Sequence, residues 1–411
     1  MLTPPPSHAH HPFFPNANGE WRVGGIPLEQ LALRVGQTPF YAYDRQTLTQ
    51  RSQQLRQQMP GGLKIYYALK ANPMPAVVQH LASLTDGFDI ASGGELKTAL
   101  DSGMPPTHIS FAGPGKSRAE LQQAIAAGVT VNIESARELQ TIDQLCTQTG
   151  LTAKLAVRLN PAFELKSAGL KMGGGPKPFG IDAEQAPAIL RRIHNLGLEF
   201  QGLHIYSGSQ NLNPAAIIAA QQNCLQLALD LSADCPTPIR ALNIGGGFGV
   251  PYFPGEQALD VTAIGAALDA AIADFRQQLP ETEVVIELGR YLVAEAGLYV
   301  TRIVDKKISR GQIFLVTDGG LHQHLAASGN FGQVIRKNYP VSIVSPQPAQ
   351  HTETVSIVGP LCTPLDILAA NMTLPKAEIG DLVVIRQSGA YGYTASPQRF
   401  LSMPPAVEVL V

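Results

Sequence analysis

The chain has 411 residues, 45% of them hydrophobic and 15% charged, which describes a globular protein and makes two domains the expectation. Its formal net charge of −2 excludes the basic excess of a nucleic-acid or anionic-membrane binder, so we expect small-molecule partners. Four cysteines without CxxC spacing do not form a disulfide framework, and we find neither a signal-peptide pattern nor a long apolar run; both observations predict a cytoplasmic protein.

An early strand is predicted over residues 38–44, and from residue 64 onward short strand-like runs alternate with helix-like runs. Eight strands are expected in this alternating region, at 64–69, 87–92, 108–113, 129–134, 153–160, 200–206, 239–246 and 283–289. Eight strands alternating with helices predict a (β/α)8 TIM barrel, in which functional side chains lie at the C-terminal ends of the strands.

After about residue 297 the pattern changes to short alternating strands separated by turns, which predicts an all-β domain. The early strand over 38–44 has the same character, so we expect both ends of the chain to build this domain. The predicted division is a tail and strand over 1–44, a barrel over 45–296 and a β domain over 297–411.

The run IYYALKANP places Lys70 where a strand ends, because Pro73 and Pro75 cannot continue it. The other predicted strand ends carry polar side chains and a glycine loop: Asp89, Arg158, Tyr206, Ser209, Gly245, Gly246, Gly247, Glu287, Gly289 and Arg290. A glycine loop late in a barrel can hold a phosphate through backbone N–H groups, although glycine triplets also serve tight turns. Together with an amine that can form a Schiff base, this pattern favours pyridoxal phosphate.

Eight motifs occur in the order found in the alanine-racemase-fold decarboxylases: YALKAN, SGGEL, VRLNP, HIYSGSQ, NIGGGFGVPY, ELGR, GPLC and GAYGY. Through these motifs the chain resembles the diaminopimelate and ornithine decarboxylases, which are fold type III pyridoxal-phosphate enzymes, over nearly its whole length. The resemblance implies that Lys70 binds pyridoxal 5'-phosphate covalently and that Glu287 contacts the pyridine nitrogen. The resemblance also implies two further sets of residues around the cofactor. The first set lies beside the cofactor and comprises Asp89, Arg158 and Tyr206. The second surrounds its phosphate and comprises Ser209, Gly245, Gly246, Gly247, Gly289, Arg290 and Tyr391.

The motif GPLCTPLD matches the family's catalytic cysteine at Cys362, although a buried inert thiol is the plain structural alternative. In the family this cysteine reaches the active site from the partner subunit and returns a proton after decarboxylation. The resemblance therefore implies an obligate homodimer with shared active sites.

Departures from the family pattern concern the distal end of the substrate. Thr363 replaces an acidic residue that binds the distal ammonium in the resembling diamine decarboxylases, and the arginine expected after the DGG motif is missing, although Arg336 follows. Tyr206 stands where the family has a histidine stacked on the cofactor ring. The stretch GLKMGGGPKPFGID is most similar to a branch associated with exosortase A and exopolysaccharide systems, which implies an amino acid substrate or one linked to an acyl carrier protein.

Two alternative functions stay open at this point. A non-catalytic or regulatory pyridoxal-phosphate-binding protein would keep the barrel, but such proteins tend to lose the lysine, the phosphate loop or Cys362. An amino acid racemase is disfavoured by Glu287, because racemases of this fold carry an arginine there. No metal site is predicted, since His322 and His324 have no evident third ligand.

Overall fold

The computed structural model describes residues 7–10, 14, 21–164, 169–346 and 351–411. Their contacts divide the chain into two compact units. One unit comprises residues 51–250 and 259–289, and the other comprises 1–50, 251–258 and 290–411, apart from the residues outside the described ranges.

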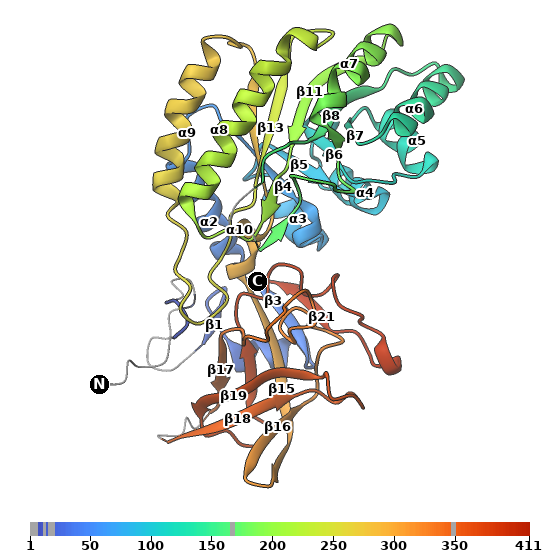
Figure 1. Cartoon of the computed structure of the whole chain (residues 1–411). Coiled ribbons are helices and arrows are strands. Elements are labelled where there is room, and N and C mark those ends of the chain that lie inside the picture. The colour runs from blue at the N-terminus through green and yellow to red at the C-terminus, as the bar shows by residue number, and fades with distance from the viewer. Residues whose placement is uncertain (1–6, 11–13, 15–20, 165–168, 347–350) are drawn as a thin grey trace. The chain divides into compact units, whose positions relative to one another are not determined.

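The first unit is a closed barrel of eight parallel strands, seen at the top of Figure 1. The strands are β4 (Lys64–Ala68), β5 (Gly87–Ile90), β6 (Ile109–Phe111), β7 (Thr130–Ile133), β8 (Lys154–Asn160), β11 (Glu199–Ile205), β13 (Ala241–Gly246) and β14 (Glu283–Leu288). They pair in this order, and β14 pairs with β4 to close the ring. The predicted (β/α)8 barrel is therefore confirmed, with each expected strand in place.

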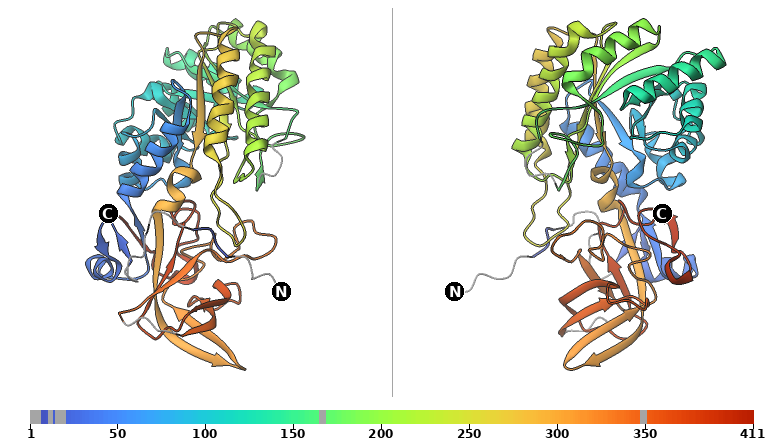
Figure 2. Two further views of the ribbon diagram at one scale, coloured as in Figure 1. Left: turned by 90° about the vertical axis from the view of Figure 1, so that its left-hand side faces the viewer. Right: turned by 45° about the vertical axis from the view of Figure 1, so that its right-hand side comes forward.

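Helices cover the outside of the barrel, as both views in Figure 2 show. Their bounds are α3 (Pro75–Leu81), α4 (Gly93–Asp101), α5 (Arg118–Ala127), α6 (Ala136–Thr149), α7 (Ala186–Asn195), α8 (Pro214–Leu231) and α9 (Val261–Arg276). A Ser-x-x-Glu pattern begins α4, α5 and α6, and in each case the serine side chain accepts a hydrogen bond from the glutamate N–H. Helix α5 ends at Gly128, whose left-handed φ of 76° suits a glycine cap.

The two faces of the barrel strands carry different residues, since successive side chains point to opposite faces. The outward positions are apolar and buried, as with Val131, Val157 and Leu203. Many inward positions are polar, as with Asn132 and His204. The hydrophobic core thus lies between the strands and the helices, and the barrel interior provides polar side chains for a functional site.

The second unit is a mixed β-sheet built from both ends of the chain. Strand β3 (Phe40–Tyr43) pairs antiparallel with β15 (Gly297–Ser309) and parallel with β21 (Val407–Leu410). The remaining strands are β16 (Gln312–Thr317), β17 (Val341–Val344), β18 (Thr352–Val358), β19 (Ile367–Pro375) and β20 (Leu382–Ile385). This arrangement confirms that the N-terminal strand joins the C-terminal sheet.

A buried cluster stabilises this second unit. Trp21, Leu28 and Phe40 pack with Leu298 and Val384, so segments from both ends of the chain share one core. The other strands and α-helices that the structure describes are β1 (Arg22–Val23), β2 (Ile26–Pro27), α1 (Leu28–Val35), α2 (Arg45–Gln58), β9 (Leu170–Lys171), β10 (Ile181–Asp182), β12 (Gly208–Ser209) and α10 (Arg290–Val293).

The division by contacts differs from the sequence division at three segments. Residues 45–50, 251–258 and 290–296 group with the sheet unit rather than with the barrel. For 251–258 the physical reason is aromatic packing, since the rings of Tyr252 and Phe253 lie 4.6 and 5.9 Å from the ring of Tyr339. Of the described helices, none is long and apolar enough to cross a membrane.

Candidate active site

Three neighbouring barrel strands bring Lys70 together with two carboxylates. Strand β4 ends at Ala68, and Lys70 follows within a single 3₁₀ turn rather than an open loop. Its Nζ lies 3.2 Å from Glu287 Oε1 on β14 and 3.7 Å from Asp89 Oδ2 on β5. The amine therefore stands at the C-terminal ends of the strands, as the sequence predicts, and both of its partners are among the predicted site residues.

The two carboxylates differ in charge because they share one cation. Burial and the charge of Glu287 raise the pKa of Asp89 well above its usual value. Burial opposes ionisation of Glu287 as well, but Lys70 and His204 hold the pKa of Glu287 below its usual value. Glu287 thus carries the negative charge of the pair, and Asp89 takes up a proton first.

His204 belongs to this cluster, although the sequence reasoning did not select it. Its Nε2 lies 3.2 Å from Glu287 Oε2, and the ring is 1% exposed. Burial lowers the pKa of His204, which favours a neutral ring beside the carboxylate. A signal existed in the sequence, because His204 precedes Tyr206 by two residues, and the alternation of an extended chain predicts that both face the same side.

Tyr206 lies where the sequence predicts a ring beside the amine. It follows the end of β11 and is 8% exposed, and Lys70 Nζ lies 5.3 Å from its ring centroid. A Cβ atom at Gly245 would lie 3.1 Å from the Tyr206 ring. The ring and the glycine loop are therefore in direct contact.

Arg158 reaches a different carboxylate, Glu134, which the sequence reasoning missed. Arg158 Nη1 donates to Glu134 Oε1 over 2.7 Å, and both side chains are nearly fully buried. Glu134 also accepts hydrogen bonds from the backbone N–H groups of Gly113 and Gly180. Despite burial, Arg158 lowers the pKa of Glu134, so this pair is ionised and ties three loop or strand ends together.

The glycine loop at the end of β13 is held close to its neighbours. Gly245 and Gly247 have φ values of 68° and 73°, the left-handed region that favours glycine. A Cβ at Gly246 would lie 2.3 Å from the carbonyl oxygen of Glu287, and one at Gly289 would lie 2.9 Å from Ala71 Cβ. Side chains are therefore excluded by close neighbours at Gly246 and Gly289 and disfavoured by the backbone conformation at Gly245 and Gly247, and such a bare backbone suits a phosphate cradle. Ser209 lies in β12, which pairs with β9.

Arg290 and Tyr391 lie in the sheet unit and contact one another there. The Arg290 guanidinium lies 4.6 Å from the Tyr391 ring and 5.4 Å from the Tyr252 ring, and it donates to Tyr252 Oη. Tyr391 has a positive φ of 53°, which costs a residue with a Cβ on the order of 1 kcal/mol and is typical of functional positions.

Cys362 lies in an exposed loop of the sheet unit. Asp366, four residues later, is 2% exposed and accepts hydrogen bonds from the N–H groups of Leu321 and Leu361. These bonds tie the Cys362 loop to the turn after β16. Cys362, Arg290 and Tyr391 thus belong to one unit and Lys70 to the other.

The histidine pair of the HQH motif lies in the same unit as Cys362. His324 is fully buried, its Nε2 lies 2.9 Å from Ser388 Oγ, and burial lowers its pKa to about 3. The side chain of His322 is also buried. Within the described ranges, no group of three His, Cys, Asp or Glu side chains could hold a metal ion.

The barrel cluster fits pyridoxal phosphate on two observations. Glu287 Oε2 and Asp89 Oδ1 are buried oxygens that, by hydrogen-bond geometry, have no donor among the described residues. A protonated pyridine nitrogen would satisfy such a carboxylate, and the glycine loop offers backbone N–H groups without side chains, as a phosphate site requires. When bound, this cofactor supplies an electron sink for the charge left as CO2 departs. The fold and the cluster together define a pyridoxal-phosphate-dependent decarboxylase of fold type III.

Comparison with known proteins leads to the same class. Residues 45–294 match the family model described as the pyridoxal-dependent decarboxylase, pyridoxal binding domain, and the chain belongs to this family. It is 38% identical to the L-glutamyl-[BtrI acyl-carrier protein] decarboxylase of Niallia circulans, over 91% of this chain and 89% of the relative. It is 31% identical to the diaminopimelate decarboxylase of Aquifex aeolicus, over 98% and 93%.

A solved structure shares the same architecture. The diaminopimelate decarboxylase of Helicobacter pylori in complex with L-lysine superposes with a TM-score of 0.82 at 29% identity, covering 93% of this chain and 94% of that one. The predicted cofactor and decarboxylase class are therefore confirmed, and the racemase and non-catalytic alternatives are set aside. The roles of the individual site residues stay predictions.

Proposed function

We propose that the chain decarboxylates an L-amino acid group whose side chain ends in a neutral linkage, as in a glutamyl group joined to an acyl carrier protein through its side-chain carboxyl. One observation carries this proposal. The charged side chains near Cys362 that could bind a charged distal end of the substrate, Asp366 and Arg336, already form hydrogen bonds with backbone groups. The named activity of the Niallia circulans relative supports the same substrate class.

The first engaged group is a carboxylate. Thr363, Pro364 and Leu365 follow Cys362 and carry no charge. The next residue, Asp366, points inward and accepts the N–H groups of Leu321 and Leu361. A distal ammonium would therefore find no carboxylate in this loop, and burying it unpaired would cost on the order of several kcal/mol.

The second engaged group is a cation. The Arg336 guanidinium donates to the carbonyl oxygens of Ser328 and Ile367. It holds two loops together instead of facing outward to a distal carboxylate. Ala326 and Ala327, which lie in the stretch where the resembling enzymes carry their arginine, are buried and uncharged. A free carboxylate at the distal end would also lack a partner here.

Within the barrel we assign each residue a role. Lys70 holds the cofactor aldehyde, and Glu287 keeps the pyridine nitrogen protonated because its own pKa is low. Tyr206 lies against the cofactor ring, and the glycine loop binds its phosphate. The test is borohydride reduction followed by peptide mass spectrometry. We expect the adduct on Lys70 and its loss in Lys70→Ala, and an adduct on another lysine would overturn the assignment.

We further propose an obligate homodimer in which Cys362 serves the site of the partner subunit. Exposed apolar side chains near Cys362 support such an interface, since Phe331 is 45%, Val334 100%, Ile335 76% and Leu365 57% exposed. A cluster of large exposed apolar side chains more often marks an association surface than a surface that stays in contact with water.

Subunit mixing tests the dimer. Lys70→Ala and Cys362→Ala chains are each expected to be inactive, but a mixed dimer has one site with both residues intact. Random pairing makes about half of the dimers mixed, so about a quarter of wild-type activity should return. Differently tagged chains verify the exchange. Verified mixed dimers that stay inactive would show that Cys362 does not act across subunits.

The substrate proposal is tested by detecting CO2 loss with mass spectrometry. The panel contains free L-glutamate, diaminopimelate, L-ornithine and L-lysine, together with L-glutamyl thioesters of pantetheine and of a carrier protein. We expect the highest kcat/KM for the thioesters. A preference for a free diamine or for diaminopimelate would overturn the neutral-end proposal.

A variant pair sharpens the test. Thr363→Asp places a carboxylate after Cys362 and should raise kcat/KM for L-ornithine relative to the thioesters. Thr352→Asp adds the same charge at an exposed position at the start of β18 and serves as the control. Equal substrate preferences in the two variants would show that the residue after Cys362 does not meet the substrate.

A further inference from the structure

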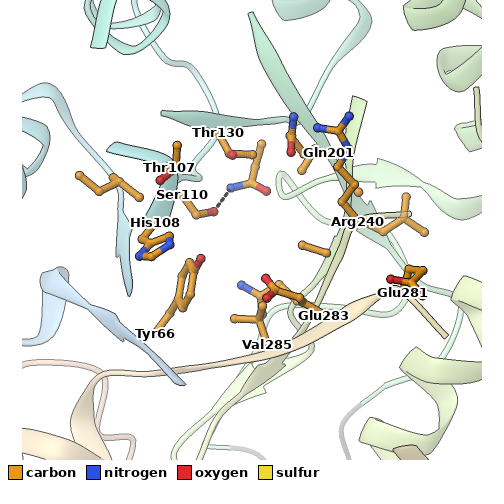
Figure 3. Close-up of a pocket in the computed structure, with 17 residues that line it drawn as sticks. Tyr66, Thr107, His108, Ser110, Thr130, Gln201, Arg240, Glu281, Glu283 and Val285 are labelled. Atoms are coloured by element: carbon orange, nitrogen blue, oxygen red, sulfur yellow. Dashed lines mark hydrogen bonds between the residues drawn. The ribbon is translucent and has the colours of Figure 1, made fainter. Parts of the chain in front are cut away.

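The barrel has a cavity at the end of the strands opposite to Lys70 and Glu287. Its volume is about 450 Å³, and it is lined at the strand starts by residues such as Ala241, and by Thr130 and Glu283 (Figure 3). This volume lies in the range of roughly 300–1,000 Å³ that small-molecule sites occupy. All of the lining residues belong to the barrel unit.

Small inward-facing residues leave this cavity open. A (β/α)8 barrel is usually filled by layers of large branched side chains. Here neighbouring strands carry Ala156, Gly202 and Ala241, which face one another in register. A Cβ at Gly202 would lie 1.8 Å from the carbonyl oxygen of Ala241, so no larger residue fits there. The cavity is thus a consequence of the strand sequences themselves.

Polar atoms with unused hydrogen-bonding capacity face the cavity. Asn132 is 1% exposed, and its Nδ2 donates to Ser110 Oγ, while Asn243 is 8% exposed and its Oδ1 accepts from the Gly245 N–H. Among the described residues, nothing pairs with the other amide atom of either side chain, nor with the Tyr66 hydroxyl. Figure 3 shows the Tyr66 ring pointing toward the cavity. Polar groups that line a cavity and have spare hydrogen-bonding capacity can bind a partner from outside the chain.

The charges around the cavity indicate which partner fits. The interior groups are a phenol, amides and hydroxyls, all neutral. The charged residues stand at the exposed rim, where Arg240 pairs with Glu199 over 3.0 Å and Glu283 lies 3.8 Å from Lys64. A phosphate or an amine would therefore find no unpaired counter-charge in the interior, and burying it would be costly.

We propose that this cavity binds a neutral polyhydroxylated molecule of about monosaccharide size. Several hydroxyl groups would meet Tyr66, Asn132 and Asn243, and the apolar wall formed by the inward-facing Ala241 and Val285 would contact its C–H groups. The site lies apart from the decarboxylation site, so the proposal does not depend on the identity of the amino acid substrate.

The test uses the full-length holoenzyme with glucose, mannose, mannitol and myo-inositol as probes, followed by saturation-transfer NMR and calorimetry. We expect at least one probe to bind saturably, with one site per chain. Ala156→Leu should abolish binding by filling the cavity, and Ala126→Leu on the exposed face of α5 is its control. Tyr66→Phe should weaken binding about three- to tenfold through one lost hydrogen bond, whereas Tyr393→Phe in the other unit should not.

The outcomes separate the proposal from its alternatives. If Ala156→Leu fails to fold, binding to Tyr66→Phe and to the isosteric Thr130→Val tests the proposal instead, because neither substitution changes the shape of the cavity. Absence of saturable binding for all four probes would show that the cavity holds solvent only and would overturn the proposal. Binding that is unchanged in Tyr66→Phe and Ala156→Leu places the ligand elsewhere, and saturable binding of glycerol phosphate instead of the neutral probes contradicts the ligand class.

Discussion

Replacing Glu134 by glutamine should strongly destabilise the barrel while leaving the sheet unit intact. Glu134 is 8% exposed and accepts three hydrogen bonds, from Arg158 and from the backbone of Gly113 and Gly180. The amide keeps one acceptor oxygen but leaves the buried Arg158 charge unpaired. Removing one partner of a buried ion pair costs about 3–5 kcal/mol, so we expect the free energy of unfolding to fall by that amount.

The assay follows the two units separately during urea unfolding. Trp21 is the single tryptophan of the chain and lies in the core of the sheet unit, so its fluorescence reports that unit. Helices α3 to α9 all belong to the barrel unit, whereas α1, the start of α2 and α10 belong to the sheet unit, so most of the helical circular-dichroism signal from the described residues reports the barrel. Glu134→Gln should lower the circular-dichroism midpoint and leave the fluorescence midpoint unchanged, if the units unfold independently.

An exposed pair of the same chemistry provides the control. Glu199 pairs with Arg240 over 3.0 Å, but these side chains are 37% and 63% exposed. Glu199→Gln should therefore cost no more than about 1 kcal/mol. A double variant, Glu134→Leu with Arg158→Met, should recover much of the loss because no charge stays unpaired. Equal costs for Glu134→Gln and Glu199→Gln would refute the reasoning that burial makes the first pair critical.

Three further predictions concern other groups. Glu287→Gln should retain the cofactor but lose most of kcat, because an amide cannot hold the pyridine nitrogen protonated; absorbance and steady-state kinetics check this, and an unchanged kcat would contradict it. The folded-state pKa of His324, about 3, lies below its usual value of 6.5, so the unfolded state binds this proton first and stability should fall as pH drops from 6.5 toward 3. The slope contributed is at most about 1.4 kcal/mol per pH unit, and urea midpoints at several pH values should vary less in His324→Asn; equal slopes would argue against this assignment. Finally, a thiol reagent should label the exposed Cys362 long before Cys224, whose pKa burial raises to about 12; peptide mapping that finds Cys224 modified first would contradict this.

The barrel could be predicted from the sequence because its signal is repeated and local. Each strand is a short apolar run followed by a helix, and serine caps such as Ser92, Ser117 and Ser135 mark where helices begin. Lys70, Asp89 and Glu287 could be found for the same reason, since they stand at the ends of these runs. The glycine triplet was found as a sequence motif, and the structure explains its glycines by the positive φ of Gly245 and Gly247 and by the close approach of the Glu287 backbone to Gly246.

Other parts of the site depend on contacts that sequence spacing does not encode. Glu134 stands at the end of a predicted strand, but only the fold brings it to Arg158 and to the backbone of Gly113 and Gly180. His204 could have been selected from the two-residue alternation on β11, whereas its partner Glu287 is distant in sequence. The inward direction of Asp366 likewise follows from hydrogen bonds to Leu321 and Leu361, not from the motif.

The pairing of β3 with β21 has a consequence for how the protein is made on the ribosome. All barrel strands lie between residues 64 and 288, so they leave the ribosome well before β21. Strand β3 leaves earlier still, but its partner β21 ends at Leu410, and the Val411 N–H next to it donates to the carbonyl oxygen of Tyr43. The N-terminal strand therefore has an open edge, a site for wrong pairing, until β21 is synthesised.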